Sequence, residues 1–358
     1  MRKKILLIPL ALLLAASLVA SCAAPAPAPA PAPAAPVEVV QWRMNSWDVE
    51  GVARHDVWKY FVNAVDETSN GRFKIDLYPA GALYPAMEAF DAVRDGITEA
   101  TYTWSDTWAG KDPVLKLGAY TPVDVFPCGA EHWYLAKELT PILSDAFQKL
   151  GVTFGGHGML VPPEAFMSNV PIRTLDDFDG VKMRSLGMGQ ELYKALGAAA
   201  TVMPMSEAYT AMKLGTIEAF EAGSYLDNWH YGYQEIAKYA IEPVLHFHGG
   251  KAITLVNTDA WNELPDDLKA IWDYCLEANA LNSLMVMRAG NAAARQNFVD
   301  YGMEFITLPD EDVAEAHQIA AATVKAYRAT SPECDQAVDV MVKVLADLGY
   351  FDLSEALK

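Results

Sequence analysis

Arg184 stands at the end of a short segment in which the apolar residues Val181 and Met183 alternate with polar ones, a pattern that favours a buried strand. An arginine at the end of a buried strand needs a partner, because an unpaired charge is costly to bury. The planar guanidinium suits a carboxylate, which it can bind through two parallel hydrogen bonds. Arg184 therefore indicates either a carboxylate-binding site or a structural bridge to Asp176 or Asp179.

Aromatic residues gather in an N-terminal segment that follows a predicted strand. Aromatic rings with a few polar groups are typical of small-ligand clefts, and we expect Tyr102 and Trp104 to contact a ligand. Packing in a core or between lobes is the alternative for most of these rings. The candidates in this part of the chain are Trp47, Tyr102, Trp104, Asp106 and Trp108.

Composition and missing motifs exclude several classes of function. The chain has 46 acidic and 27 basic residues, and such an acidic surface repels nucleic acid. An exported hydrolase would need a nucleophile and a base, but the sequence has no Gly-x-Ser-x-Gly, His-Glu-x-x-His or Gly-rich phosphate loop. No cysteine has zinc-site spacing, and the sequence leaves open which pair among Cys128, Cys275 and Cys334 could form a disulfide.

The N-terminus has the pattern of a lipoprotein signal peptide over residues 1–21. Three cations precede an apolar run, and the final "VASC" fits a lipobox that would place a lipid on Cys22. An ordinary signal with an incidental cysteine is the alternative. The Ala/Pro-rich residues 22–36 favour an extended linker. We therefore expect a periplasmic protein attached to the membrane by its lipid anchor alone.

Strand and helix patterns alternate along the chain and restart near residue 150. Val57, Phe61 and Val65 have helical spacing, and a helical pattern without glycine runs from Pro265 to Gly290. This order predicts an α/β fold, a two-lobed clamshell like the periplasmic binding proteins, with a long inter-lobe helix. The predicted parts are lobe I at 37–161 with about 251–290, lobe II at 162–250 with part of 291–320, and a C-terminal helical tail at 321–358.

Residues 175–221 carry a specific series of motifs. "LDDFDGVKMRSLG" is followed by "KALGA", then by "PMSEAYTAMKLG" and an acidic strand end. The series resembles the substrate-binding proteins of TRAP transporters, the DctP-type solute receptors. "WAGKDP" (108–113) and "EAGSYLDNWHYGYQEIAKY" (221–239) resemble the subgroup that binds 2-oxo or 2-hydroxy monocarboxylates with a metal ion.

This resemblance implies a binding protein without catalytic activity, which closes around a small organic acid and delivers it to TRAP membrane subunits. A receptor that serves a signalling partner stays open as an alternative. The resemblance makes Arg184 the carboxylate clamp and Glu221 a ligand of Na⁺ or Ca²⁺, with the carbonyl of Ala222. Glu164 lies near the position of a glutamine ligand in the subgroup, so either it replaces that ligand or the metal is absent.

Tyr225 and His246 are weaker candidates for ligand contacts, since a lone histidine is more often structural. The subgroup can dimerise through its C-terminal helices, which leaves monomer and homodimer open. The sequence does not identify the acid, because Ala222, Glu164 and Met167 depart from the subgroup where ligand size is set.

Overall fold

The computed structural model describes residues 39–358, apart from 124, 128, 164, 204, 222, 247, 248 and the side chain of 206. The predicted signal peptide, the lipidation site Cys22 and the linker lie outside these residues, as do Cys128 and the predicted ion ligands Ala222 and Glu164. Val39–Lys358 forms one compact unit. No helix in the described part of the chain is long and apolar enough to cross a membrane.

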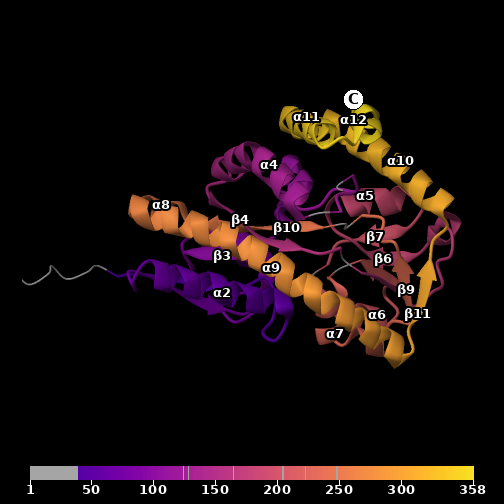
Figure 1. Cartoon of the computed structure of the whole chain (residues 1–358), viewed down its shortest axis with the longest axis horizontal. Helices are drawn as coiled ribbons and strands as arrows, with labels where there is room; N and C mark the ends of the chain where they lie inside the picture. The colour runs from indigo at the N-terminus through magenta and orange to yellow at the C-terminus, as the bar shows by residue number, and fades with distance from the viewer. Residues whose placement is uncertain are drawn as a thin grey trace, which may run out of the picture. The chain divides into compact units, whose positions relative to one another are not determined.

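Five strands form the first sheet, in the order β2-β1-β3-β10-β4 (Figure 1). Strand β1 pairs in parallel with β2 and β3, whereas β10 runs antiparallel to β3 and β4. This sheet and the helices packed on it are called the first lobe below. The strands are β1 (Val40–Asn45), β2 (Phe73–Tyr78), β3 (Ala100–Thr103), β4 (Thr153–Val161) and β10 (Gly250–Val256).

Helices α2 and α4 lie on opposite sides of the first sheet (Figure 1). Helix α2 buries Val57, Phe61 and Val65, which confirms the helical spacing predicted for them. The segment after β3 continues as two short 3₁₀ helices and carries Asp106 toward the second lobe. The elements of the first lobe are α2 (Ala53–Thr68), η1 (Ala86–Glu88), α3 (Ala89–Arg94), η2 (Ser105–Trp108), η3 (Pro113–Leu117), α4 (Gly129–Lys149) and α8 (Thr258–Glu263).

Six strands form the second sheet, in the order β11-β9-β5-β8-β6-β7. Strand β5 is antiparallel to β8 and β9, and the other neighbours are parallel. Phe166 and Met167 of β5 belong to two different apolar clusters, as alternation across a sheet requires. The strands are β5 (Phe166–Ser168), β6 (Lys182–Arg184), β7 (Ala199–Thr201), β8 (Ala219–Glu221), β9 (Tyr239–Glu242) and β11 (Glu304–Thr307).

The second sheet and the helices packed on it are called the second lobe. Both of its faces are covered, because the two apolar clusters include residues of α5 and α6 respectively. The elements are η4 (Leu175–Phe178), α5 (Gly187–Ala195), α6 (Met205–Lys213), α7 (Tyr225–His230) and η5 (Tyr233–Glu235).

Helix α9 (Asp266–Tyr301) runs past both sheets (Figure 1). Its first half contributes Trp272 to the core of the first lobe, and its second half contributes Phe298 to an apolar cluster of the second. The helix continues through Gly290, where the sequence pattern suggested an end. The two-sheet α/β architecture with this long helix confirms the fold predicted from the sequence.

Helix α9 also covers the outer edge of β4, which is the last strand of the first sheet. Edge strands expose polar groups that need partners. Trp272 donates from Nε1 to the Gly155 carbonyl, and Asn279 donates from Nδ2 to the Gly158 carbonyl, both at 2.8 Å. Glycine is required at 158 because a Cβ there would lie 2.6 Å from the ring of Trp58.

The C-terminal residues are helical, as the amphipathic pattern predicts. Their helices are not separate from the lobes, since Val338 and Met341 lie in the core of the first lobe. The boundary expected at residue 320 falls inside α10. Cys275 and Cys334 are buried free thiols. The helices are α10 (Asp310–Tyr327), η6 (Arg328–Thr330), α11 (Pro332–Asp347) and α12 (Phe351–Leu357).

Candidate ligand-binding site

Arg184 ends β6, which lies between β8 and the edge strand β7 of the second sheet, and the residue is only 3% exposed. Its Nε donates to the Met203 carbonyl at 3.1 Å, and its Nη1 donates to the Glu221 carbonyl at 2.5 Å. These two carbonyl oxygens orient the guanidinium group. The structure therefore fixes a buried cation at the carboxyl end of a strand, where an α/β sheet binds its ligands.

The carboxylate of Glu221, at the end of the adjacent strand β8, is fully buried. Tyr193 donates to Oε1 at 3.0 Å and Ser185 donates to Oε2 at 3.5 Å. His246 places Nδ1 3.3 Å from the same Oε2. The structure thus brings together three of the predicted site residues, Arg184, Glu221 and His246. Burial and the charge of Glu221 raise the pKa of Tyr193 well above its usual range, so its hydroxyl stays a donor.

The described residues test the ion site only in part. Of its three predicted ligands, Glu221 is described, whereas Ala222 and Glu164 are not. Within the described residues, no three side chains of His, Cys, Asp or Glu are grouped closely enough to hold a metal ion. The ion site stays a prediction because the donors near Glu221 do not by themselves complete one.

The first lobe contributes Trp104, which is 2% exposed and directly follows β3. Its ring lies 5.0 Å from that of Tyr120, and the Tyr120 ring lies 6.2 Å from that of His246. This row of rings leads from the predicted aromatic segment to the residues around Glu221. Nothing in the sequence pattern singled out Tyr120.

Asp106 of η2 lies against the start of α5 in the second lobe. A Cβ on Gly187 would sit 2.6 Å from Oδ2 of Asp106, so only glycine permits this approach. The φ of Gly187 is +54°, which also favours glycine. Asp106 is 5% exposed, and burial raises its pKa to about 6 against the opposing charges of His246 and Arg184.

The same end of α5 approaches His246 through a second glycine. A Cβ on Gly189 would lie 2.1 Å from His246 Nδ1, the atom that faces Glu221. Gly187 and Gly189 therefore let Asp106 and His246 meet at the start of one helix. The "GMG" sequence at 187–189 did not predict this junction, because the need for glycine arises from contacts with segments distant in the sequence.

The profile of the DctP family, described as bacterial extracellular solute-binding protein, family 7, matches residues 47–330. The chain belongs to this family. The membership confirms the resemblance seen in residues 175–221, and it assigns the chain to extracytoplasmic substrate-binding receptors.

Relatives of this solute-binding protein agree with the assignment. A monocarboxylate 2-oxoacid-binding periplasmic protein from Nostoc sp. is 27% identical over 282 residues, which are 78% of this chain and 77% of the relative. A TRAP periplasmic solute-binding protein from Pseudoalteromonas atlantica, solved with sodium and pyruvate, has a TM-score of 0.80 at 21% identity, over 87% of this chain and 95% of that one. A TRAP transporter solute-binding protein from Bordetella bronchiseptica, solved with copurified calcium and picolinate, has a TM-score of 0.79 at 21% identity, over 89% and 95%.

A buried polar network joins the two lobes of the solute-binding protein near Tyr102. The Tyr102 hydroxyl donates to Asp48 Oδ2 at 2.6 Å and its ring stacks on Trp58. Tyr231 donates to Asp48 Oδ1 at 3.1 Å from the second lobe. Arg54 donates to the same oxygen at 3.1 Å. Tyr102 therefore serves an inter-lobe network in this structure, and none of its described contacts reaches Arg184.

Tyr225 lies elsewhere in the solute-binding protein. Its hydroxyl donates to Glu242 Oε1 at 2.7 Å, and Arg295 pairs with both oxygens of Glu242. Tyr225 and Glu242 line a cavity of about 450 Å³ beside α9, together with Arg288. The described contacts of Tyr225 thus join it to Glu242 and to this cavity, and its predicted contact with a ligand stays a prediction.

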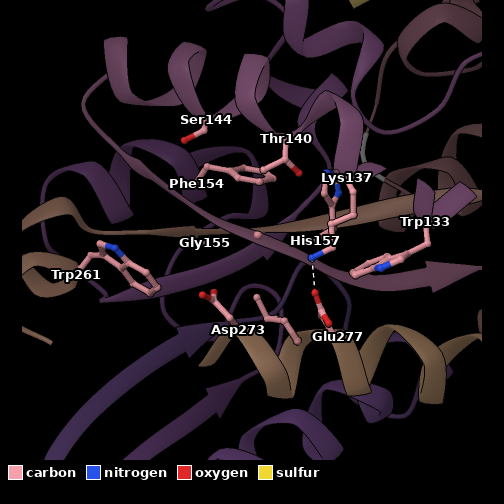
Figure 2. A pocket seen from close by; sticks show the side chains of 12 residues that line it. Trp133, Lys137, Thr140, Ser144, Phe154, Gly155, His157, Trp261, Asp273 and Glu277 are labelled. Atoms are coloured by element: carbon pink, nitrogen blue, oxygen red, sulfur yellow. Dashed lines mark hydrogen bonds and ion pairs between the residues drawn. The ribbon is translucent and has the colours of Figure 1, made fainter. Parts of the chain in front are cut away.

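A further cavity, of about 390 Å³, lies between α4 and α9 beside β4 (Figure 2). Lys137 and Glu277 form an ion pair at its rim, which neutralises the cation. Burial lowers the pKa of His157 to about 3, so this residue is neutral. The described lining contains none of the predicted site residues, and an anion would find no comparable partner to Arg184 there.

Proposed function

We propose that this chain is the extracytoplasmic solute receptor of a TRAP transporter and binds a small organic acid as its anion. The observation that carries the proposal is the buried Arg184, held by two carbonyl oxygens at the carboxyl end of β6. A guanidinium in that setting gains most from a carboxylate. Family membership and the 2-oxoacid-binding relative support the same ligand class.

The proposed mechanism is closure of the two lobes around the acid. Arg184 binds the carboxylate from the second lobe, while Trp104 and Asp106 of the first lobe close over the other side. Hinge closure is the usual response of two-lobed receptors, and the ligand shifts the population toward the closed form. The closed receptor then docks on the membrane subunits and delivers the acid to them chemically unchanged.

We also propose that Na⁺ or Ca²⁺ takes part in binding, by analogy with the relatives solved with sodium and pyruvate and with calcium and picolinate. Glu221, the carbonyl of Ala222 and Glu164 would supply hard oxygen ligands. Such an ion would add positive charge next to the carboxylate. The lipid anchor at Cys22 and the periplasmic location belong to the same proposal, with the "VASC" sequence as their support.

Calorimetry with small organic acids tests the proposal through Arg184→Ala. Loss of the charged hydrogen-bonding group should weaken binding by on the order of 100-fold or more. Arg173→Ala is the matched control, since Arg173 lies on the same lobe in an exposed ion pair with Glu304. Unchanged affinity of the folded Arg184→Ala protein would remove the carboxylate clamp. Consumption of the acid would instead indicate an enzyme.

A further inference from the structure

Asp106 is a buried acid without a side-chain hydrogen-bond partner among the described residues. It is 5% exposed, and no described side chain donates a hydrogen bond to either carboxylate oxygen, although the backbone amides of Asp106 and Thr107 lie near enough to favour its ionised form. A buried polar group without a partner is costly, and a buried charge more so. The position therefore makes most sense if a donor reaches it when the site is filled.

The surroundings of Asp106 place that donor next to the proposed carboxylate site. Oδ2 lies against Gly187, three residues after Arg184, where α5 begins. The positive charge of Arg184 is close enough to lower the pKa of Asp106, and His246 acts in the same direction. Arg184 and Asp106 thus present opposite charges to the same region from the two lobes.

We propose that Asp106 makes the receptor select acids whose carbon next to the carboxylate carries a hydrogen-bond donor, which are 2-hydroxy or 2-ammonio acids. The inference rests on the proposed function, because Arg184 must hold the carboxylate. A 2-hydroxyl or 2-ammonium group donates to the free oxygens of Asp106. A 2-oxo group offers only an acceptor, so its oxygen faces an ionised carboxylate without a proton between them.

The geometry favours this assignment over a purely structural role. A structural aspartate usually has a side-chain donor within hydrogen-bond distance, as Asp227 has in the hydroxyl of Ser224. Asp106 instead lies against the backbone of Gly187, which contributes no side chain that could compete with a ligand. The pKa of about 6 means that the carboxyl group is ionised, and hence an acceptor only, at pH 7.5.

Isothermal titration calorimetry at pH 7.5 with matched acids tests the proposal. Each triplet shares one carbon skeleton: lactate, pyruvate and alanine, then the 2-hydroxy, 2-oxo and 2-amino acids of four and six carbons. The wild-type receptor should bind the 2-hydroxy or 2-amino member at least about 10-fold more tightly than the 2-oxo member. Which of the two binds better distinguishes a neutral donor from a cationic one.

Asp106→Asn then isolates the role of the carboxylate, with thermal unfolding as a check on folding. The Asn amide can donate to a 2-oxo oxygen, so the preference over the 2-oxo acid should fall by about 10-fold or more. Binding of a 2-amino acid should weaken most, because its ammonium group also loses the negative charge of Asp106. Asp56→Asn is the matched control, since Asp56 is an exposed residue of α2 paired with Lys59.

The outcomes distinguish the role of Asp106 in ligand selection from the proposed function as an organic-acid receptor. Equal or tighter wild-type binding of 2-oxo acids overturns the role of Asp106 and leaves the organic-acid receptor intact. An equal loss of all three acids in Asp106→Asn also overturns it, because a structural residue or an ion ligand would behave in that way. If none of the triplets nor any other organic acid binds the wild type, the proposed function itself fails.

Discussion

Nε of Arg54 in α2 lies 3.7 Å from Oδ2 of Asp227 in α7, so a buried ion pair joins the first lobe to the second. Asp48 pairs with the same guanidinium at 3.1 Å. All three side chains are almost fully buried. The pair between Arg54 and Asp227 can form only while the lobes are together, which ties this network to closure.

Arg54→Ala should disfavour the closed receptor. The change leaves Asp48 and Asp227 buried without their cation, and breaking a buried pair in this way costs about 3–5 kcal/mol. Opening the lobes returns both acids to water, so the cost falls on the closed form and ligand affinity should drop by about 100-fold or more. Small-angle scattering should show a larger radius of gyration for the variant at a ligand concentration that closes the wild type.

Arg43→Ala is the control for that experiment, since Arg43 and Glu99 form an exposed pair on the first sheet. Such pairs contribute about 0–1 kcal/mol, and affinity should not change. A lower melting temperature for Arg54→Ala with unaltered affinity would show that the network holds the fold and not the closed form.

Asp106→Asn should stabilise the ligand-free receptor at neutral pH while it alters ligand preference. The folded-state pKa is about 6 against an ordinary 3.8. Between these values the native state binds more protons than the unfolded chain, so wild-type stability falls as pH rises from about 4 to 6. The wild type should lose on the order of 3 kcal/mol of its free energy of unfolding over this range. The Asn variant lacks the titrating group and should not show this loss.

Urea unfolding of both proteins at pH 4 and pH 7.5 measures this difference in the free energy of unfolding. The two proteins should differ more at pH 7.5 than at pH 4. The difference between the two free energies of unfolding excludes the contribution of other buried acids, because both proteins contain them. One such acid is Asp227, whose pKa is also raised by burial. A difference independent of pH would contradict the burial of an ionised Asp106.

Gly189→Ala should damage the ligand site more than the fold. The new Cβ would meet His246 Nδ1 at 2.1 Å, so the ring must move away from Glu221. Overpacking of this kind costs about 1–3 kcal/mol, and ligand affinity should fall with it. Gly110→Ala is the control, because a Cβ at 110 meets no atom within 4 Å. Equal behaviour of the two variants in calorimetry would show that the His246 contact is dispensable.

Removal of metal ions should weaken binding if Glu221 is an ion ligand. Dialysis against a chelator in sodium-free buffer should lower the affinity for the organic acid. Adding back Na⁺ or Ca²⁺ should restore that affinity only with the ion that the site prefers. Glu221→Gln should remove this dependence. Affinity that is the same in metal-free and metal-containing buffers would refute the ion site and leave Arg184 as the carboxylate clamp.

The sequence predicted those features that depend on local spacing. The buried stripe of α2 follows from Val57, Phe61 and Val65, and Arg184 was placed at a strand end by the alternation before it. The pairing of Arg184 with backbone carbonyls was not predictable, because those carbonyls belong to segments folded against it from residues 203 and 221.

Contacts between distant segments account for what the sequence did not predict. Tyr225 stays a predicted ligand contact, but local spacing did not reveal that its hydroxyl would meet Glu242, which Arg295 also binds. Asp106 stood in the aromatic segment without a distinct role, because its significance depends on Gly187 across the lobe boundary. Such contacts arise from tertiary packing, which no single stretch of sequence encodes.

Helix α9 restricts how the lobes can move. A continuous helix of 36 residues is about 54 Å long, and its two halves are packed into apolar clusters of different lobes. Sliding either lobe along the helix would pull buried side chains such as Trp272 or Phe298 out of their clusters. A hinge rotation needs no such sliding along the helix. We therefore expect closure to be a rotation, so that acids of different size would be registered as different closure angles.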